Sequence, residues 1–201
     1  MTDAGDERAG ARRRILDAAV ARIAREGIDE VRIARIAMDA GVSPALVHYH
    51  FESRDALLVE ALEHSYEIAG DTRTTDPEDA GAPAAERLRA IIDSCLPVPG
   101  MQRDDWLLWV ELWLRAARHP ELAEAATRLY GRLHEWVGDS IAFGVAGGEF
   151  AAVDSDQLAD HLLALMDGYG LRVLIGDATV DLDRARAEIW AVAAQALGLE
   201  H

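Results

Sequence analysis

Hydrophobic residues recur at intervals of three and four along most of the chain, which is the spacing of an amphipathic α-helix. Gly, Pro, Asp and Ser gather between these segments, where helices end and begin. The pattern predicts about nine helices, at 8–26, 32–39, 44–50, 53–69, 84–95, 103–118, 120–143, 155–175 and 182–197, with a polar linker at 70–83. The alternation typical of strands is nearly absent. We therefore expect an all-α protein with an N-terminal three-helix domain at 1–56 and a C-terminal helical domain at 57–201.

Two short helical patterns within residues 31–57 are joined by a turn of a few residues. Gly41 permits the positive φ that a sharp reversal needs. Ser43 is a good N-cap, and Pro44 suits the first position of the next helix. The first pattern places Ile33, Ile36, Ala37 and Ala40 on one inward face, and the second buries Val47 and Phe51. This arrangement predicts a helix-turn-helix, whose second helix enters the major groove of DNA.

The second helix leaves a mixed surface of small, aromatic and hydrogen-bonding side chains, which suits a DNA groove. We expect Pro44, Ala45, Leu46 and His48 to approach base edges. Tyr49, His50 and Arg54 are expected to contact phosphates. Arg32, Arg35 and Ser43 complete the set of candidate DNA-binding residues.

The segment IAMDAGVS at 36–43, followed by YHFESR at 49–54 and by Leu57, resembles the DNA-binding domain of the tetracycline-repressor (TetR) family. Arg32 and His48 depart from the Thr and Tyr often found there, so the resemblance does not give the operator sequence. It implies a homodimeric bacterial regulator, most often a repressor. Such a regulator binds a palindromic operator in double-stranded DNA and responds to a small-molecule effector.

Aromatic residues concentrate in the C-terminal domain. The run WLLWVELWLRAARHPEL at 106–122, with DGYGL at 167–171, resembles the choline-responsive branch of the same family. Three of its tryptophans share one helix face, which is typical either of a core or of a pocket wall. The resemblance implies an effector pocket among the helices at 103–118, 120–143 and 155–175. Its candidate ligand-binding residues are Trp106, Trp109, Trp113, Tyr130, Asp167 and Tyr169.

Asp167 lies within the apolar run at 162–171, where a carboxylate is costly unless it is paired or hydrogen-bonded. It is either an anchor for a cationic effector or a structural acceptor of hydrogen bonds. A cationic amine would gain from indole faces. A neutral or hydrophobic effector would suit the same aromatic walls, so the sequence leaves the effector unknown.

Apolar stripes run along the last two predicted helices. One contains Leu158, Leu162 and Leu165, and the other contains Ile189 and Val192. Two such helices can pack against the same pair in a second copy as a four-helix bundle, or they can form the chain's own core. Because the resemblance implies a dimer, we expect these five residues to form the dimer interface.

The formal net charge of −16, from 36 acidic and 20 basic residues, is unusual for a DNA-binding protein. The acidic excess lies outside the predicted DNA-binding domain, since residues 1–56 hold 9 Arg and 10 acidic residues. Non-specific DNA affinity should therefore be weak, because an acidic body repels the phosphate backbone.

Patterns of other protein classes are missing from the sequence. The seven His form no HExxH motif, and no Gly-rich phosphate loop is present. The single Cys95 gives neither a disulfide framework nor a CxxC zinc pattern. No apolar run reaches the roughly 18 residues of a membrane span. We expect a cytoplasmic protein that is not an enzyme and has no metal, cofactor or membrane segment. The alternative is a helical protein-interaction module without sequence-specific DNA binding.

Overall fold

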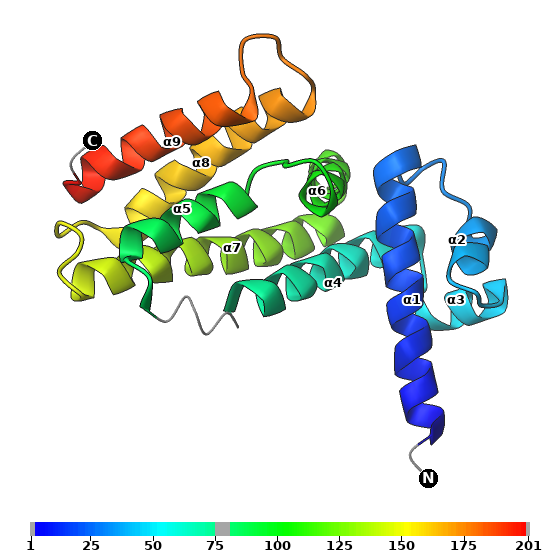
Figure 1. Cartoon of the computed structure of the whole chain (residues 1–201). Helices are drawn as coiled ribbons and strands as arrows, with labels where there is room; N and C mark the ends of the chain where they lie inside the picture. Colours follow the sequence, from blue (N-terminus) through cyan, green and yellow to red (C-terminus); the bar gives the residue numbers. More distant parts are fainter. Residues whose placement is uncertain (1–2, 75–80, 200–201) are drawn as a thin grey trace. The chain divides into compact units, whose positions relative to one another are not determined.

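The computed structural model describes residues 3–74 and 81–199 and folds them into nine α-helices without a strand (Figure 1). The helices are α1 (Asp3–Glu26), α2 (Ile33–Asp39), α3 (Pro44–His50), α4 (Arg54–Thr74), α5 (Ala84–Ser94), α6 (Met101–Ala116), α7 (Pro120–Ala146), α8 (Ser155–Leu174) and α9 (Leu182–Leu197). The predicted all-α fold is confirmed. Within the described ranges, none of these helices is both long and apolar enough to cross a membrane.

The largest differences from the predicted boundaries lie at α1 and α4. The first helix begins at Asp3, and the fourth continues to Thr74. The start of the predicted linker at 70–83 is therefore helical, and its residues 75–80 lie outside the described part of the chain.

The chain forms two compact units. Unit 1 consists of Met1–Thr74 and Asp104–Ala126, and unit 2 consists of Thr75–Arg103 and Thr127–His201. By compactness, α4 and most of α6 thus belong with the helix-turn-helix. The predicted division at residue 56 separates the DNA-binding helices from the ligand-binding and dimerisation region, and it stays a prediction.

Unit 1 is built around α1, which packs against α2, α3 and α4. Its inward face consists of Ile15, Leu16, Ala19 and Ile23, each at most 1% exposed. These side chains recur every three or four residues, so one stripe of α1 meets several helices at once. Gly27, at a φ of 73°, follows α1 and turns the chain toward α2.

Unit 2 has its own core, in which α8 and α9 lie side by side and α5 packs against α9 (Figure 1). The core includes Leu88 and Ile92 of α5, Val137 and Ile141 of α7, Leu162 and Leu163 of α8, and Ile189 and Ala193 of α9. Local signals fix the helix ends. Asp154 accepts a hydrogen bond from the backbone N–H of Gln157, and Gly198 ends α9 at a φ of 67°.

Candidate functional site

The recognition helix α3 begins as its sequence predicts. Gly41 has a φ of 65° and reverses the chain after α2. The Ser43 hydroxyl accepts a hydrogen bond from the backbone N–H of Leu46 at 3.2 Å, and Pro44 follows in the first turn. Val47 is fully buried and holds α3 against the unit 1 core. Pro44, Ala45, His48 and Tyr49, on the other sides of α3, are exposed.

Most of the candidate DNA-binding side chains lie on the surface. Arg32, Arg35, Ser43, Pro44, Ala45, His48, Tyr49 and Arg54 are exposed, whereas Leu46 and His50 are partly buried. The Nε2 atom of His50 is buried and has no hydrogen-bond partner among the described residues, so it is not presented to a phosphate here. The structure thus gathers these residues on and around the helix-turn-helix, and their contacts with DNA stay a prediction.

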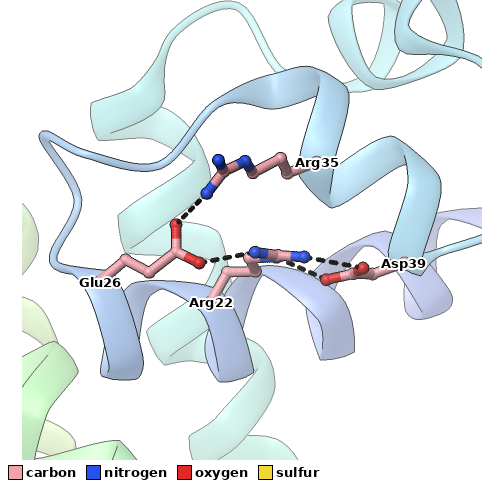
Figure 2. Close-up of polar contacts among 4 residues, drawn as sticks. All are labelled: Arg22, Glu26, Arg35 and Asp39. Carbon is pink, nitrogen blue, oxygen red and sulfur yellow. Dashed lines mark hydrogen bonds and ion pairs between the residues drawn. The ribbon is translucent and has the colours of Figure 1, made fainter.

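Figure 2 shows an ionic network that ties α2 to α1. Arg22 of α1 donates to both carboxylate oxygens of Asp39, from Nε at 2.6 Å and from Nη2 at 3.0 Å. Its Nη1 donates to Glu26 at 2.6 Å, and the other oxygen of Glu26 faces Arg35 at 3.5 Å. Two parallel hydrogen bonds between a guanidinium and a carboxylate fix geometry as well as charge. The network therefore holds α2 in a defined position on α1.

Asp39 is the last residue of α2, where a carboxylate opposes the helix dipole. The hydrogen bonds from Arg22 compensate for this placement and lower the pKa of Asp39. A second arginine of α1, Arg14, donates from Nε to the carbonyl oxygen of Ala40 at 3.2 Å. The start of the turn before α3 is therefore anchored twice. Sequence reasoning missed Arg22, because the only local signal was an acidic residue at the end of a short helix.

Two candidate DNA-binding arginines, Arg35 and Arg54, already have protein partners. The contact of Arg35 with Glu26 is long, and its side chain is 52% exposed. Arg54 donates from Nη1 to the backbone carbonyl oxygen of Asp29 at 3.0 Å. Exposed ion pairs such as Arg35–Glu26 contribute little to stability, so this contact does not commit Arg35 to Glu26.

The three tryptophans of α6 form one cluster in unit 1. Trp113 meets Trp106 edge-on at a centroid distance of 6.1 Å and lies tilted against Trp109 at 5.6 Å. Trp106 is 7% exposed, and the other two are partly buried. These geometries are favourable for aromatic pairs. Both interpretations from the sequence, a core and a pocket wall, fit this cluster.

Asp167 of α8 forms a polar pair with Tyr130 of α7 inside unit 2. The Tyr130 hydroxyl donates to Asp167 Oδ2 at 2.6 Å. Burial raises the pKa of Asp167, and the hydrogen bond from Tyr130 opposes this shift only in part. Burial and the neighbouring carboxylate also raise the pKa of Tyr130. Burial and the Tyr130 hydrogen bond are the causes of the shift in the Asp167 pKa, and no charged side chain is among them. Tyr169 is partly buried and packs against the unit 2 core.

The residues expected at the dimer interface do not share one environment. Leu158, Leu162 and Ile189 are at most 6% exposed, because they pack in the chain's own core. They have almost no surface left for a partner, so their assignment to an interface needs revision. Leu165 is partly buried, and Val192 remains 41% exposed. Sequence periodicity identified the apolar helices, but it did not separate their inward from their outward stripes.

Comparison with known proteins gives two family matches. Residues 15–61 match the family described as bacterial regulatory proteins, tetR family. Residues 84–198 match the family described as BetI-type transcriptional repressor, C-terminal. The two matches cover the helix-turn-helix and most of the remaining chain.

Similar full-length proteins agree with these matches. The HTH-type transcriptional regulator BetI of Brucella suis biovar 1 is 28% identical over 177 residues, covering 88% of this chain and 86% of the relative. The BetI regulator of Brucella anthropi is 30% identical, covering 82% of each chain.

Solved structures show the same similarity in three dimensions. A transcriptional regulator from Saccharomonospora viridis, solved in complex with choline, has a TM-score of 0.80 and 36% identity. The alignment covers 93% of this chain and 96% of that one. A TetR-family regulator from a Rhodococcus species also has a TM-score of 0.80, at 27% identity, covering 94% of this chain and 99% of that one. This chain therefore belongs to the TetR family of bacterial transcriptional regulators, with a C-terminal region of the BetI type.

Proposed function

We propose that this regulator is a cytoplasmic repressor that binds a palindromic operator as a homodimer and is controlled by a quaternary ammonium effector. The DNA-binding part of the proposal is supported by the family and by the exposed outer side of α3. The effector class is carried by one observation, the partly buried Asp167 carboxylate whose protein partner is the neutral Tyr130 hydroxyl.

DNA recognition is proposed to divide between groove and backbone contacts. The short side chains Pro44 and Ala45 let α3 approach the base edges closely, and His48 adds a hydrogen-bonding group. Tyr49 is 73% exposed and its hydroxyl can donate to a phosphate. Arg54, at the first position of α4, adds a positive charge. One helix-turn-helix covers a few base pairs, so high affinity at physiological salt requires the two helix-turn-helices of a dimer on two half-sites.

The dimer interface is proposed to lie on the outward side of α8 and α9. Leu171 is 43% exposed, Ile175 is 70% exposed and Val192 is 41% exposed. Ala164, Gly168, Leu171 and Ile175 follow each other at intervals of three and four on α8 and its C-cap, and all four are exposed. Small residues among larger apolar ones allow two helices to approach closely. This stripe replaces the buried residues Leu158, Leu162 and Ile189 in the interface.

A cationic effector suits Asp167 for an electrostatic reason. A carboxylate removed from water is destabilised unless a positive charge or several hydrogen bonds replace the lost hydration. Tyr130 supplies one hydrogen bond, and the raised pKa of Asp167 shows that this does not fully compensate. A quaternary ammonium group carries a diffuse positive charge and has no N–H group that needs an acceptor. It would stabilise the carboxylate without breaking the bond from Tyr130.

Calorimetric titration of the purified protein tests the effector class. Choline is compared with 3,3-dimethylbutan-1-ol, which has the same shape and no charge. We expect the wild-type protein to bind choline at least about 10-fold more tightly, a difference of about 1.4 kcal/mol. Asp167→Asn should abolish this preference. Asp183→Asn, which removes a carboxylate with a side chain 92% exposed, should preserve it. Trp109→Ala tests separately whether the tryptophan cluster takes part.

Two results would contradict the effector class. One is equal affinity of the wild-type protein for the charged and the neutral compound. The other is undiminished choline binding by Asp167→Asn in a protein that remains folded and dimeric. A neutral effector would then be the better explanation for the aromatic residues.

A further inference from the structure

Arg115, in the last turn of α6, holds two acidic residues of the DNA-binding unit. Its Nη1 donates to Asp55 Oδ1 at 2.9 Å, and its Nη2 forms an ion pair with Asp29. Asp29 lies between α1 and α2, and Asp55 lies in the first turn of α4. The Arg115 side chain is only 17% exposed, and its Nε is buried without a partner among the described residues. Its guanidinium is thus directed at these two carboxylates and is withdrawn from solvent.

A second contact fixes the direction of α6 relative to α4. The Ser65 hydroxyl donates to Asp105 Oδ1, at the other end of α6. Moving ten residues forward on α6, from Asp105 to Arg115, corresponds to moving ten residues backward on α4, from Ser65 to Asp55. The two contacts therefore join α4 and α6 in opposite chain directions, at points about 15 Å apart along each helix, given a rise of about 1.5 Å per residue. Contacts at both ends restrict sliding of α6 along α4.

Arg54 lies next to this ion-pair cluster. It precedes Asp55 directly, and it donates to the backbone carbonyl oxygen of Asp29 at 3.0 Å. Asp29 is therefore held from two sides, through its carboxylate by Arg115 and through its carbonyl oxygen by Arg54. While Arg115 neutralises the two carboxylates, Arg54 does not need to pair with them. Without Arg115, both carboxylates would lie unpaired beside Arg54 and attract its guanidinium.

We propose that Arg115 is a positioning residue for DNA binding, which keeps Arg54 available to a phosphate by holding Asp29 and Asp55. The inference rests on the proposed function, because it takes Arg54 as a phosphate contact. Arg115 itself is largely withdrawn from solvent and acts through its neighbours. The cluster thereby joins the helix that carries the tryptophan cluster to a residue at the DNA surface.

A double-mutant cycle on the full-length protein tests this role. The probe is a DNA duplex enriched by the wild-type protein from a random-sequence library. Its affinity is measured by fluorescence anisotropy at several salt concentrations for the wild-type protein, Arg54→Ala, Arg115→Gln and the double variant. Arg118→Gln serves as the matched control, because Arg118 is an exposed arginine just beyond α6. Thermal unfolding and light scattering confirm that each variant is folded and dimeric.

Losing one phosphate contact per half-site lowers the slope of log K against log salt by about 0.9 per half-site. We expect both single variants to lose this amount. The double variant should bind no more weakly than Arg54→Ala, because residues acting through one contact are not additive. Arg118→Gln should match the wild-type protein.

Three results would overturn the inference: an unchanged salt slope in Arg115→Gln, full additivity in the double variant, or an equal loss in Arg118→Gln. Should Arg115→Gln fail to fold, Arg115→Lys decides, since a lysine cannot bridge both carboxylates with a planar fork. Wild-type affinity and slope in Arg115→Lys would also overturn it. If no duplex is enriched at all, the proposed function itself fails, and the inference falls with it.

Discussion

Ile175 offers a quantitative test of the proposed dimer interface. It is 70% exposed in the single chain, although it follows α8 directly in an apolar stripe. Complete burial of an Ile side chain contributes about 1.5 to 3 kcal/mol, so covering the exposed 70% contributes about 1 to 2 kcal/mol. A two-fold interface contains the residue twice. Ile175→Ser should therefore destabilise the dimer by about 2 to 4 kcal/mol, or roughly 30- to 1000-fold in its dissociation constant.

Sedimentation equilibrium over a range of protein concentrations measures this dissociation constant. Met38→Ser is the matched control, because Met38 is also 70% exposed but lies on α2 of the DNA-binding unit. We expect Met38→Ser to dimerise like the wild-type protein. If Ile175→Ser has the wild-type dissociation constant, or if both variants lose the dimer equally, the outward side of α8 and α9 is not the interface.

Three further predictions concern the DNA and effector sites. Arg54→Ala in a dimer removes two phosphate contacts, so the loss of operator affinity between about 50 and about 200 mM salt should be about 12-fold smaller than in the wild-type protein. Equal salt dependence of the two proteins, measured by anisotropy, would refute the contact. Asp39→Asn should reduce affinity for the enriched duplex more than for a scrambled duplex and leave the salt slope unchanged, because the Arg22 network positions α3 without touching phosphate. An equal loss of affinity for both duplexes would contradict this role. Choline affinity should rise with pH as Asp167 ionises, and the midpoint should lie above the ordinary carboxyl pKa of 3.8 because burial raises the pKa of Asp167. Calorimetry should find no such rise in Asp167→Asn, and a rise that persists in this variant would assign the titration to another group.

The helix pattern and the recognition turn could be predicted because both depend on local rules. Gly41, Ser43 and Pro44 act within one turn of chain, and the structure places each as expected. The same holds for Asp154 at the start of α8 and Gly198 at the end of α9. At such positions the residue type alone indicates the capping or turning role, so a single sequence is sufficient to find them.

Contacts between distant residues could not be predicted in this way. Arg22 and Asp39 are 17 residues apart, and Arg115 and Asp29 are 86 residues apart. No periodic rule relates such pairs, because their meeting depends on how whole helices pack. The interface prediction at Leu158, Leu162 and Ile189, which the structure buries in the chain's own core, shows a related limit. An apolar stripe looks the same whether it faces the chain's own core or a second copy.

Selection of duplexes from random-sequence DNA by the wild-type protein tests whether a homodimer recognises a specific operator. We expect enrichment of a two-fold symmetric sequence whose half-sites are separated by about one helical turn, or a multiple of it. Symmetry is expected because two identical reading heads in a dimer meet the two strands in the same way. Recovery of no preferred sequence, or of a preferred sequence without two-fold symmetry, would contradict operator recognition by a homodimer.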